Sequence, residues 1–214
     1  MVVRGFFYIY RKDTVASEYI IGVDESGTGA WAGPFTLCAI ALPRDARIPG
    51  VTDSKALSDR GRRNLLFEIS VHSIFGAVDF GTVADVARLG LKETWRRCVV
   101  DVVAAVVDEI GAQDIVIDGL GETWPKLARA ARGGRIKFEK KADIKYPAVS
   151  AASIVAKTAR NDEMLRLHSQ YPEYEWNRNY GYGVPRHIEV IGVRGASAHH
   201  RAIKPLQHVP RRNP

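Results

Sequence analysis

Two adjacent carboxylates at the end of an apolar run are the first residues in this sequence that could do chemistry. Asp24 and Glu25 follow residues 20–23, which read Ile-Ile-Gly-Val, and residues 27–29 read Gly-Thr-Gly. Two adjacent carboxylates in such a place are energetically costly, because like charges repel and burial removes their hydration. A bound cation would offset this cost. Glycines allow backbone N–H groups to approach a ligand closely, and a phosphate suits such a turn well. The segment therefore predicts a metal-dependent site that acts on phosphodiesters.

Two more acids come where the chain is predicted to leave a strand or to enter a helix. Asp118 ends the apolar run 115–117, and Asp143 precedes a long predicted helix. Ligands gather at strand ends in α/β sheets, so these acids could join the first pair. Carboxylates without His or Cys suit Mg²⁺ or Mn²⁺, and two such ions can promote hydrolysis of a phosphodiester. On local sequence alone, Asp118 serves equally well as a turn former, and a solvated charge run explains Asp143 better.

The elements that must position these acids alternate between strands and helices. Strands are predicted over residues 19–23, 35–42, 73–83, 114–118 and 135–139. Helices are predicted over residues 58–69, 91–110, 124–132 and 147–169, with one more opened by Pro185. Ser58 is a good N-cap, and the apolar residues of 91–110 recur at steps of three and four until Gly111 stops the helix. Residues 141–146 are predicted to form a charged loop, and the whole pattern predicts an α/β layer fold.

Composition and charge narrow the range of partners. The chain has 214 residues, 46% of them hydrophobic, as expected for a globular protein with a substantial core. Its 31 Lys and Arg exceed its 24 Asp and Glu, and the net charge of +7 favours nucleic acid as a partner. Cys38 and Cys98 lie in apolar runs without zinc-type spacing, which predicts buried thiols and a reducing, cytoplasmic setting. No apolar run reaches the roughly 18 residues of a membrane span, and we expect a monomer without a membrane partner.

Four groups of residues form motifs that follow one another along the chain. They are Asp24-Glu25-Ser26-Gly27-Thr28-Gly29 with Gly33-Pro34; Asp53-Ser54-Lys55 with Leu57-Ser58; residues 141–157, from Lys-Ala-Asp to Ala-Lys; and residues 179–183, Asn-Tyr-Gly-Tyr-Gly, with His187 and His200-Arg201. In this order the motifs resemble those of the type 2 ribonucleases H, the ribonuclease HII family. The resemblance covers residues 20 to 205, and the third motif is long and specific.

The resemblance implies a ribonuclease H-like α/β fold with a mixed central sheet flanked by helices. The catalytic domain is expected over residues 1–170, with a helical C-terminal extension and basic tail over 171–214 packed on it. The implied activity is endonucleolytic hydrolysis of the RNA strand of RNA/DNA hybrids, which leaves 5′-phosphate and 3′-hydroxyl ends. Cleavage 5′ to ribonucleotides embedded in DNA is left open. The implied catalytic and metal-binding residues, which would hold two Mg²⁺ or Mn²⁺ ions with substrate, are Asp24, Glu25, Asp118 and Asp143.

The same resemblance implies residues that contact the nucleic acid. Tyr182 would stack on the sugar next to the cut and sense its 2′-OH, together with Gly27, Thr28 and Gly29. Basic residues in or beside the motifs are predicted to contact nucleic acid: Lys55, Lys145, Lys157 and Arg201. Other polar residues receive structural predictions: His187 and His200 as hydrogen-bonded structural histidines, and Asp162 as a helix-surface charge that holds no metal.

The chain departs from the family pattern at Thr28, where the family usually has Arg. The Gly-Thr-Gly form resembles type 3 ribonucleases H, which prefer continuous hybrids to single embedded ribonucleotides. Residues 141–157 nevertheless have the type 2 form, and the residues ahead of the first strand are too few for the extra N-terminal domain of type 3. Two alternatives remain open: a non-catalytic hybrid-binding protein, and a DNA nuclease of related fold. The presence of all four carboxylates favours an active enzyme.

Overall fold

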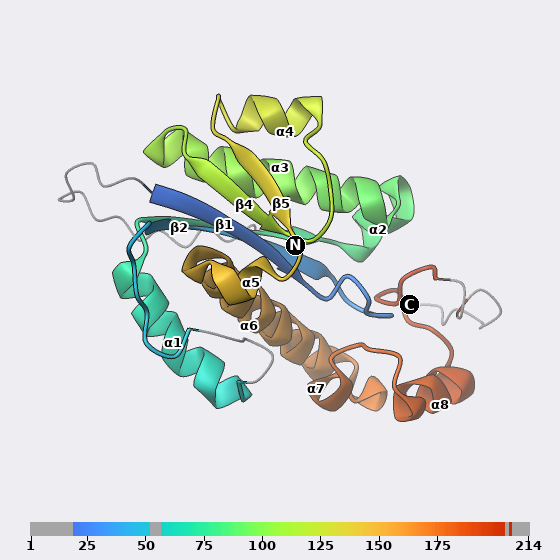
Figure 1. The fold of residues 1–214 in the computed structure, drawn as a ribbon. Helices are drawn as coiled ribbons and strands as arrows, with labels where there is room; N and C mark the ends of the chain where they lie inside the picture. The colour runs from blue at the N-terminus through green and yellow to red at the C-terminus, as the bar shows by residue number, and fades with distance from the viewer. Residues whose placement is uncertain (1–18, 52–56, 204–205, 207–214) are drawn as a thin grey trace.

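A five-stranded sheet forms the centre of the computed structural model, which describes residues 19–51, 57–203 and 206 (Figure 1). The strands are β1 (Tyr19–Ser26), β2 (Phe35–Pro43), β3 (Phe75–Gly81), β4 (Asp114–Asp118) and β5 (Ile136–Glu139). They lie in the order β3-β2-β1-β4-β5. The pairs β1–β2 and β2–β3 are antiparallel, whereas β1–β4 and β4–β5 are parallel. The predicted mixed sheet is confirmed.

Helices cover both faces of this sheet and make it the middle layer. They are α1 (Asp59–His72), α2 (Val83–Leu89), α3 (Leu91–Ile110), α4 (Pro125–Ala130), α5 (Ala142–Lys145), α6 (Pro147–Gln170), the 3₁₀ turn η1 (Pro172–Tyr174), α7 (Trp176–Asn179) and α8 (Pro185–Arg194). Helices α3 and α4 lie on one face, and α1 and α6 lie on the other (Figure 1).

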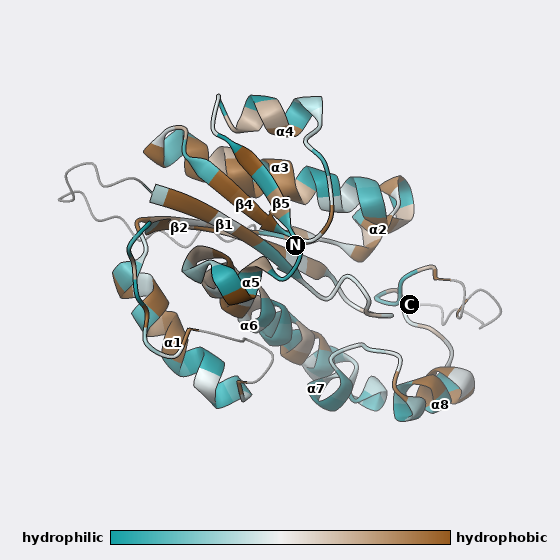
Figure 2. Ribbon diagram, in the orientation of Figure 1, coloured by the Kyte–Doolittle hydropathy of each residue, from teal (hydrophilic) through white to brown (hydrophobic). Residues whose placement is uncertain are grey.

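The two cores follow from the alternation of side chains along the strands. In β2, Phe35 and Leu37 join the core beneath α3, whereas Cys38 and Ile40 join the core beneath α6. Because neighbouring residues of a strand point to opposite faces, a continuous apolar run is required where both faces are covered. Figure 2 shows hydrophobic residues running along the central strands β1 and β4. The expected buried thiols at Cys38 and Cys98 are confirmed.

Several element boundaries follow from local signals, and two predictions were wrong. Ser58 caps α1 by accepting a hydrogen bond from the Gly61 N–H at 3.1 Å, as predicted. The predicted strand 73–83 is shorter, because Thr82 accepts from the Asp85 N–H at 3.0 Å and so begins α2, which was not predicted. The predicted charged loop 141–146 contains a one-turn helix, α5.

The C-terminal segment packs on the far end of α6. Met164 and Leu167 of α6 form a third apolar cluster with Tyr174, Trp176 and Ile191. No helix among the described residues is long and apolar enough to cross a membrane.

Two buried histidines tie this cluster together, as the sequence predicted. His187 Nδ1 lies 2.9 Å from the Tyr182 carbonyl and must donate to it, so its Nε2 accepts from Trp176 Nε1 at 3.1 Å. His200 Nε2 lies 3.2 Å from the same acceptor, and His200 Nδ1 accepts from the Ser197 N–H at 2.9 Å. The Tyr182 carbonyl therefore fixes the Nδ1–H tautomer of His187, and His200 packs beside it.

Candidate active site

The first two acids leave β1 on opposite faces of the sheet. Asp24 is 7% exposed and faces α6, where Ser153 hydrogen-bonds to its carboxylate. Glu25 faces α3, and Trp95 Nε1 donates to Glu25 Oε2 at 3.3 Å. The Glu25 N–H also donates to Asp24 Oδ1 at 2.7 Å. Each helix layer therefore supplies one side chain that orients one acid of the pair.

Asp118 and Asp143 lie at the same end of the sheet. Strand β4 runs parallel beside β1 with Ile117 opposite Val23, so Asp118 follows at the level of Asp24. Asp118 Oδ1 accepts a hydrogen bond of 2.7 Å from the Ala142 N–H, the first of α5. Asp143 is the next residue and is 6% exposed. A carboxylate at a helix N-terminus is favourable, and here it joins the Lys-Ala-Asp motif to the end of β4.

The electrostatics of the site show a deficit of positive charge around Asp24. The pKa of Asp24 is raised from 3.8 to about 7, chiefly by burial and also by the nearby charges of Glu25 and Asp118, whereas the hydrogen bonds from Ser153 and from the Glu25 N–H act in the opposite direction. A carboxyl group with such a pKa is only partly ionised at neutral pH without a cation. A divalent ion bound beside it would restore the ionised form.

The donor chemistry fits Mg²⁺ or Mn²⁺, although the arrangement is open. All four predicted ligands are carboxylates, the oxygen donors that these hard ions prefer. Across the part of the chain that the structure describes, no three His, Cys, Asp or Glu side chains form a closed ligand group. Glu25 accepts from Trp95 and Asp118 accepts from the Ala142 N–H, and both acids lie close enough to Asp24 to raise its pKa.

A glycine in β1 brings α6 close to the acids. A Cβ atom added to Gly22 would lie 2.2 Å from the backbone of both Ala148 and Val149. Only glycine therefore permits the first turn of α6 to lie directly on β1. This contact places Ser153, just over one turn further along α6, within hydrogen-bonding reach of Asp24.

A buried guanidinium holds the loop that follows the acids. Arg201 is 2% exposed and donates to the carbonyls of Gly27 at 2.8 Å, Thr28 at 2.8 Å and Gly33 at 2.9 Å. Its N–H also donates to the Trp31 carbonyl at 2.8 Å. The structure thus places Arg201 beneath the loop as a positioning residue, and its three side-chain donors are turned away from solvent. The nucleic-acid contact predicted for Arg201 stays a prediction.

A second buried arginine connects this loop to the Gly-Tyr-Gly segment. Arg160 of α6 donates to the Pro34 carbonyl at 3.1 Å and to the Tyr180 carbonyl at 2.8 Å. Gly27 has a φ of +88°, and a Cβ there would lie 1.8 Å from Arg160 Nε, so glycine is required on both grounds.

The ring of Tyr182 lies over the same guanidinium. The Arg160 Cζ atom is 5.0 Å from the ring centroid, and Tyr182 remains 40% exposed. The Gly181 carbonyl accepts from the N–H groups of Trp31 and Ala32 at 2.8 and 3.1 Å, which fixes the turn on the loop. The structure therefore brings Tyr182 and residues 27–29 together, with the ring open to a ligand.

The predicted lysine contacts have different surroundings. Lys145 of α5 is largely exposed and forms an ion pair with Glu139 at the end of β5. Lys157 lies on α6, half-buried, one turn beyond Ser153. Lys55 lies outside the described residues. Asp162 is an exposed helix-surface charge paired with Arg63, as predicted.

Four residues of the site were not found by sequence reasoning. Trp95, Ser153 and Arg160 each reach the site from a helix that lies far from Asp24 in the chain. Glu139 lies opposite Asp118 in the sheet, and its pKa is lowered to about 2 by hydrogen bonds from Lys137, Lys145 and Tyr146. Ser153 and Arg160 lie in or just after the third motif, which was the one available signal.

The sheet order and the acids at the ends of β1 and β4 define a protein of the ribonuclease H-like fold class. The family model described as Ribonuclease HII matches residues 21–205, and the chain belongs to the ribonuclease HII family. It is therefore a ribonuclease H, a hydrolase of the endonuclease type.

Relatives and solved structures agree with this family. The ribonuclease HII of Bacillus cereus (strain G9842) is 35% identical over 202 residues, which cover 92% of this chain and 75% of that protein. The ribonuclease HII of Halorhodospira halophila is 33% identical, with 89% and 94% covered. The ribonuclease HII solved in complex with PCNA from Archaeoglobus fulgidus superposes with a TM-score of 0.71 at 28% identity, covering 86% of this chain and 92% of that one. A ribonuclease HIII named Bst-RNase HIII, solved with Mn²⁺, has a TM-score of 0.63 at 25% identity, covering 84% and 63%.

Proposed function

We propose that this protein hydrolyses the RNA strand of RNA/DNA hybrids at Asp24, Glu25, Asp118 and Asp143, with 5′-phosphate and 3′-hydroxyl products. The observation that carries the proposal is Asp24, a buried carboxylate whose pKa is raised to about 7 among other acids at a strand end. Such a group is costly in a purely structural role and is typical of a site that binds cations. Membership of the ribonuclease HII family supports the same reaction.

The four carboxylates would hold two Mg²⁺ or Mn²⁺ ions when substrate is bound. Bound ions of this kind supply Lewis acidity that activates water and offsets negative charge on the phosphate. The chain's own contribution is orientation. Ser153 holds Asp24, Trp95 holds Glu25, and the Ala142 N–H holds Asp118.

Residues 27–29 and Tyr182 would read the ribose. The exposed ring of Tyr182 offers an apolar face and a hydroxyl, which together can distinguish a sugar with a 2′-OH from one without it. Gly29 has open space around its Cα, so the backbone there can approach a sugar closely. Thr28 is shorter than the Arg usual in the family, and we propose that this shifts preference toward continuous hybrids, as in type 3 enzymes.

The test compares wild type with Asp24→Asn on two end-labelled duplexes, a full RNA/DNA hybrid and DNA with one ribonucleotide, in Mg²⁺ and in Mn²⁺. Wild type should cut the hybrid, and Asp24→Asn should cut at least about a thousandfold more slowly. Hybrid binding should stay within about threefold, because the variant removes one negative charge and nearly no volume. Asp162→Asn, an equivalent change at an exposed acid on α6, is the matched control.

Each rival function has its own outcome in this test. Binding of the hybrid by wild type without cleavage in either metal would identify a non-catalytic hybrid-binding protein. Cleavage of an all-DNA duplex at a comparable rate would identify a DNA nuclease. Cleavage of both ribonucleotide-containing duplexes, with a cut 5′ to the single ribonucleotide, would show that Thr28 does not restrict the enzyme to continuous hybrids.

A further inference from the structure

A cavity beside Glu25 combines aromatic rings with cations. It has a volume of about 580 Å³ and lies between the first turns of α3 and the segment after β4. Its lining residues are Lys92, Trp95, Arg96, Leu120, Gly121, Glu122, Trp124 and Phe138. We propose that this cavity binds a sugar–phosphate unit of the RNA/DNA duplex next to the cleavage point; the inference rests on the function proposed above.

The aromatic part of the cavity is preformed. The ring centroids of Trp95 and Trp124 are 6.2 Å apart, and those of Trp124 and Phe138 are 6.3 Å apart. All three rings are only partly buried and pack on the core with one side. Gly121 lies directly against Phe138, since a Cβ there would approach its ring to 2.8 Å. The rings therefore offer a rigid apolar surface on which the C–H face of a sugar can lie.

The charged part of the cavity suits a phosphate. Lys92, Trp95 and Arg96 have helical spacing and share one side of α3, near the positive end of that helix. The Arg96 guanidinium lies 5.4 Å above the Trp124 ring and also bonds to Glu93 at 2.9 Å. Glu122 is the one acid on the lining. Among the lining residues, two cations therefore stand against one acid beside the aromatic surface, and Glu93, the partner of Arg96, is not part of the lining.

The position of the cavity connects it to the cleavage site. Trp95 lines the cavity and donates to Glu25, and Leu120, which is 87% exposed, comes two residues after Asp118. Tyr182 lies on the other face of the sheet, against Arg160 of α6. A duplex whose scissile phosphate lies at the acids can therefore contact the Tyr182 loop on one side and this cavity on the other.

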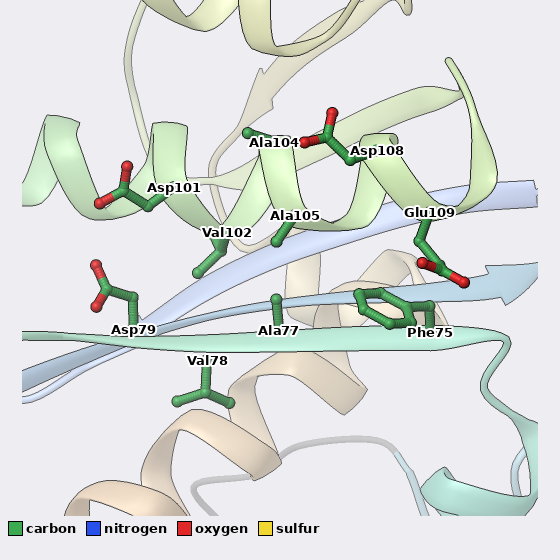
Figure 3. Close-up of a pocket in the computed structure, with 10 residues that line it drawn as sticks. All are labelled: Phe75, Ala77, Val78, Asp79, Asp101, Val102, Ala104, Ala105, Asp108 and Glu109. Carbon is green, nitrogen blue, oxygen red and sulfur yellow. The ribbon is translucent and has the colours of Figure 1, made fainter. Parts of the chain in front are cut away.

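A second hollow on α3 lacks the combination of aromatic rings and cations that lines the cavity beside Glu25. That hollow, of about 360 Å³, lies against the edge strand β3 and has four acids on its lining: Asp79, Asp101, Asp108 and Glu109 (Figure 3). Its remaining lining residues are apolar, and Arg97 pairs with two of the acids. A polyanion would be repelled there, whereas the cavity beside Glu25 would attract it.

The test uses Trp124→Leu, Trp124→Phe and Arg96→Gln, with Arg47→Gln as the matched control. Arg47 is exposed and follows β2 at the opposite end of the sheet, where Pro43 pairs with Tyr19. Steady-state cleavage of a hybrid gives KM and kcat. Fluorescence anisotropy gives the Kd of the same hybrid in an Asp24→Asn background, and thermal unfolding checks that each variant folds.

Trp124→Leu should raise both KM and Kd about fivefold and leave kcat within about twofold, because it removes the ring and keeps most of the apolar volume. Trp124→Phe should restore most of the loss. Arg96→Gln should weaken binding and reduce the slope of log Kd against log salt by about 1, and Arg47→Gln should change neither. KM and Kd within about twofold of wild type for both Trp124→Leu and Arg96→Gln would overturn the proposal.

The two proposals fail separately. If wild type cleaves the hybrid and the cavity variants behave like wild type, the cavity proposal is wrong and the proposed function stands. If wild type does not cleave, the proposed function is wrong, and the Kd values alone then decide whether the cavity binds the duplex.

Discussion

Arg201→Lys tests whether a buried guanidinium, rather than a charge, organises the loop after the acids. The three side-chain nitrogens of Arg201 donate to the carbonyls of Gly27, Thr28 and Gly33. Lysine keeps the charge but has one terminal nitrogen on a shorter reach, so it can satisfy one of these carbonyls. The substitution therefore separates the effect of the guanidinium geometry from the effect of the positive charge.

The size of the effect follows from the carbonyls that lose their only donor. The Gly27 carbonyl keeps a hydrogen bond from the Ala30 N–H at 3.2 Å, so a lysine that reaches Thr28 or Gly33 leaves one carbonyl without a partner. A buried acceptor without a partner costs about 1–3 kcal/mol, so the free energy of unfolding should fall by that amount. For a chain of this length, this corresponds to a fall in Tm of roughly 2–12 °C. Burial, together with the nearby Arg160, already lowers the pKa of Arg201 to about 10, so the charge itself is not favoured in this place.

The assay combines thermal unfolding with hybrid cleavage and with binding as a function of salt. We expect Arg201→Lys to lower Tm and to reduce kcat at least about tenfold, because residues 27–29 are no longer held. The salt slope of binding should stay at the wild-type value for Arg201→Gln as well, since all three side-chain nitrogens of Arg201 donate to carbonyls of the loop. Arg47→Lys serves as the control for the chemical change.

Two results would refute this reasoning. If Arg201→Lys keeps the wild-type Tm and kcat, the conformation of the loop does not depend on the guanidinium group. A salt slope reduced by about 1 in Arg201→Gln, with an unchanged Tm, would show a direct phosphate contact as first predicted from the sequence.

Three further predictions concern packing, pH and surface charge. Gly22→Ala should lower the free energy of unfolding by about 3 kcal/mol or more and abolish cleavage, because the new methyl group overlaps the backbone of α6. A wild-type urea midpoint and a wild-type Tm would contradict the close contact. Burial lowers the pKa of His187 below 6.5, so its contribution to stability is full above pH 6.5 and is lost as the pH falls through the folded pKa. Thermal melts from pH 8 to pH 5 should show this loss in wild type and a smaller one in His187→Gln; equal losses would assign the effect to other groups. Asp162→Asn should keep kcat within about twofold, because its partner Arg63 is exposed and such pairs contribute little; a large loss would place Asp162 in the catalytic site.

Much of the fold and of the site could be predicted from local sequence, because the signals act over a few residues. The helix 91–110 was predicted with its observed bounds, since its apolar spacing and Gly111 are both local features. Ser58 and Pro147 mark their helix starts for the same reason. The order of the four motifs indicated the family, and the comparisons confirm it.

The remaining features depend on contacts between residues that are far apart in the chain. No local pattern shows that Trp95 bonds to Glu25, that Ser153 bonds to Asp24, or that Arg201 lies beneath the loop rather than on its surface. Helix α5 was predicted as a loop because one turn has little intrinsic stability, and the Asp118 carboxylate that caps it comes from another strand. The residue types and their spacing thus determined what chemistry the chain can support. Only the tertiary structure decided which side chains orient the acids, because burial and hydrogen bonding arise when the layers pack together.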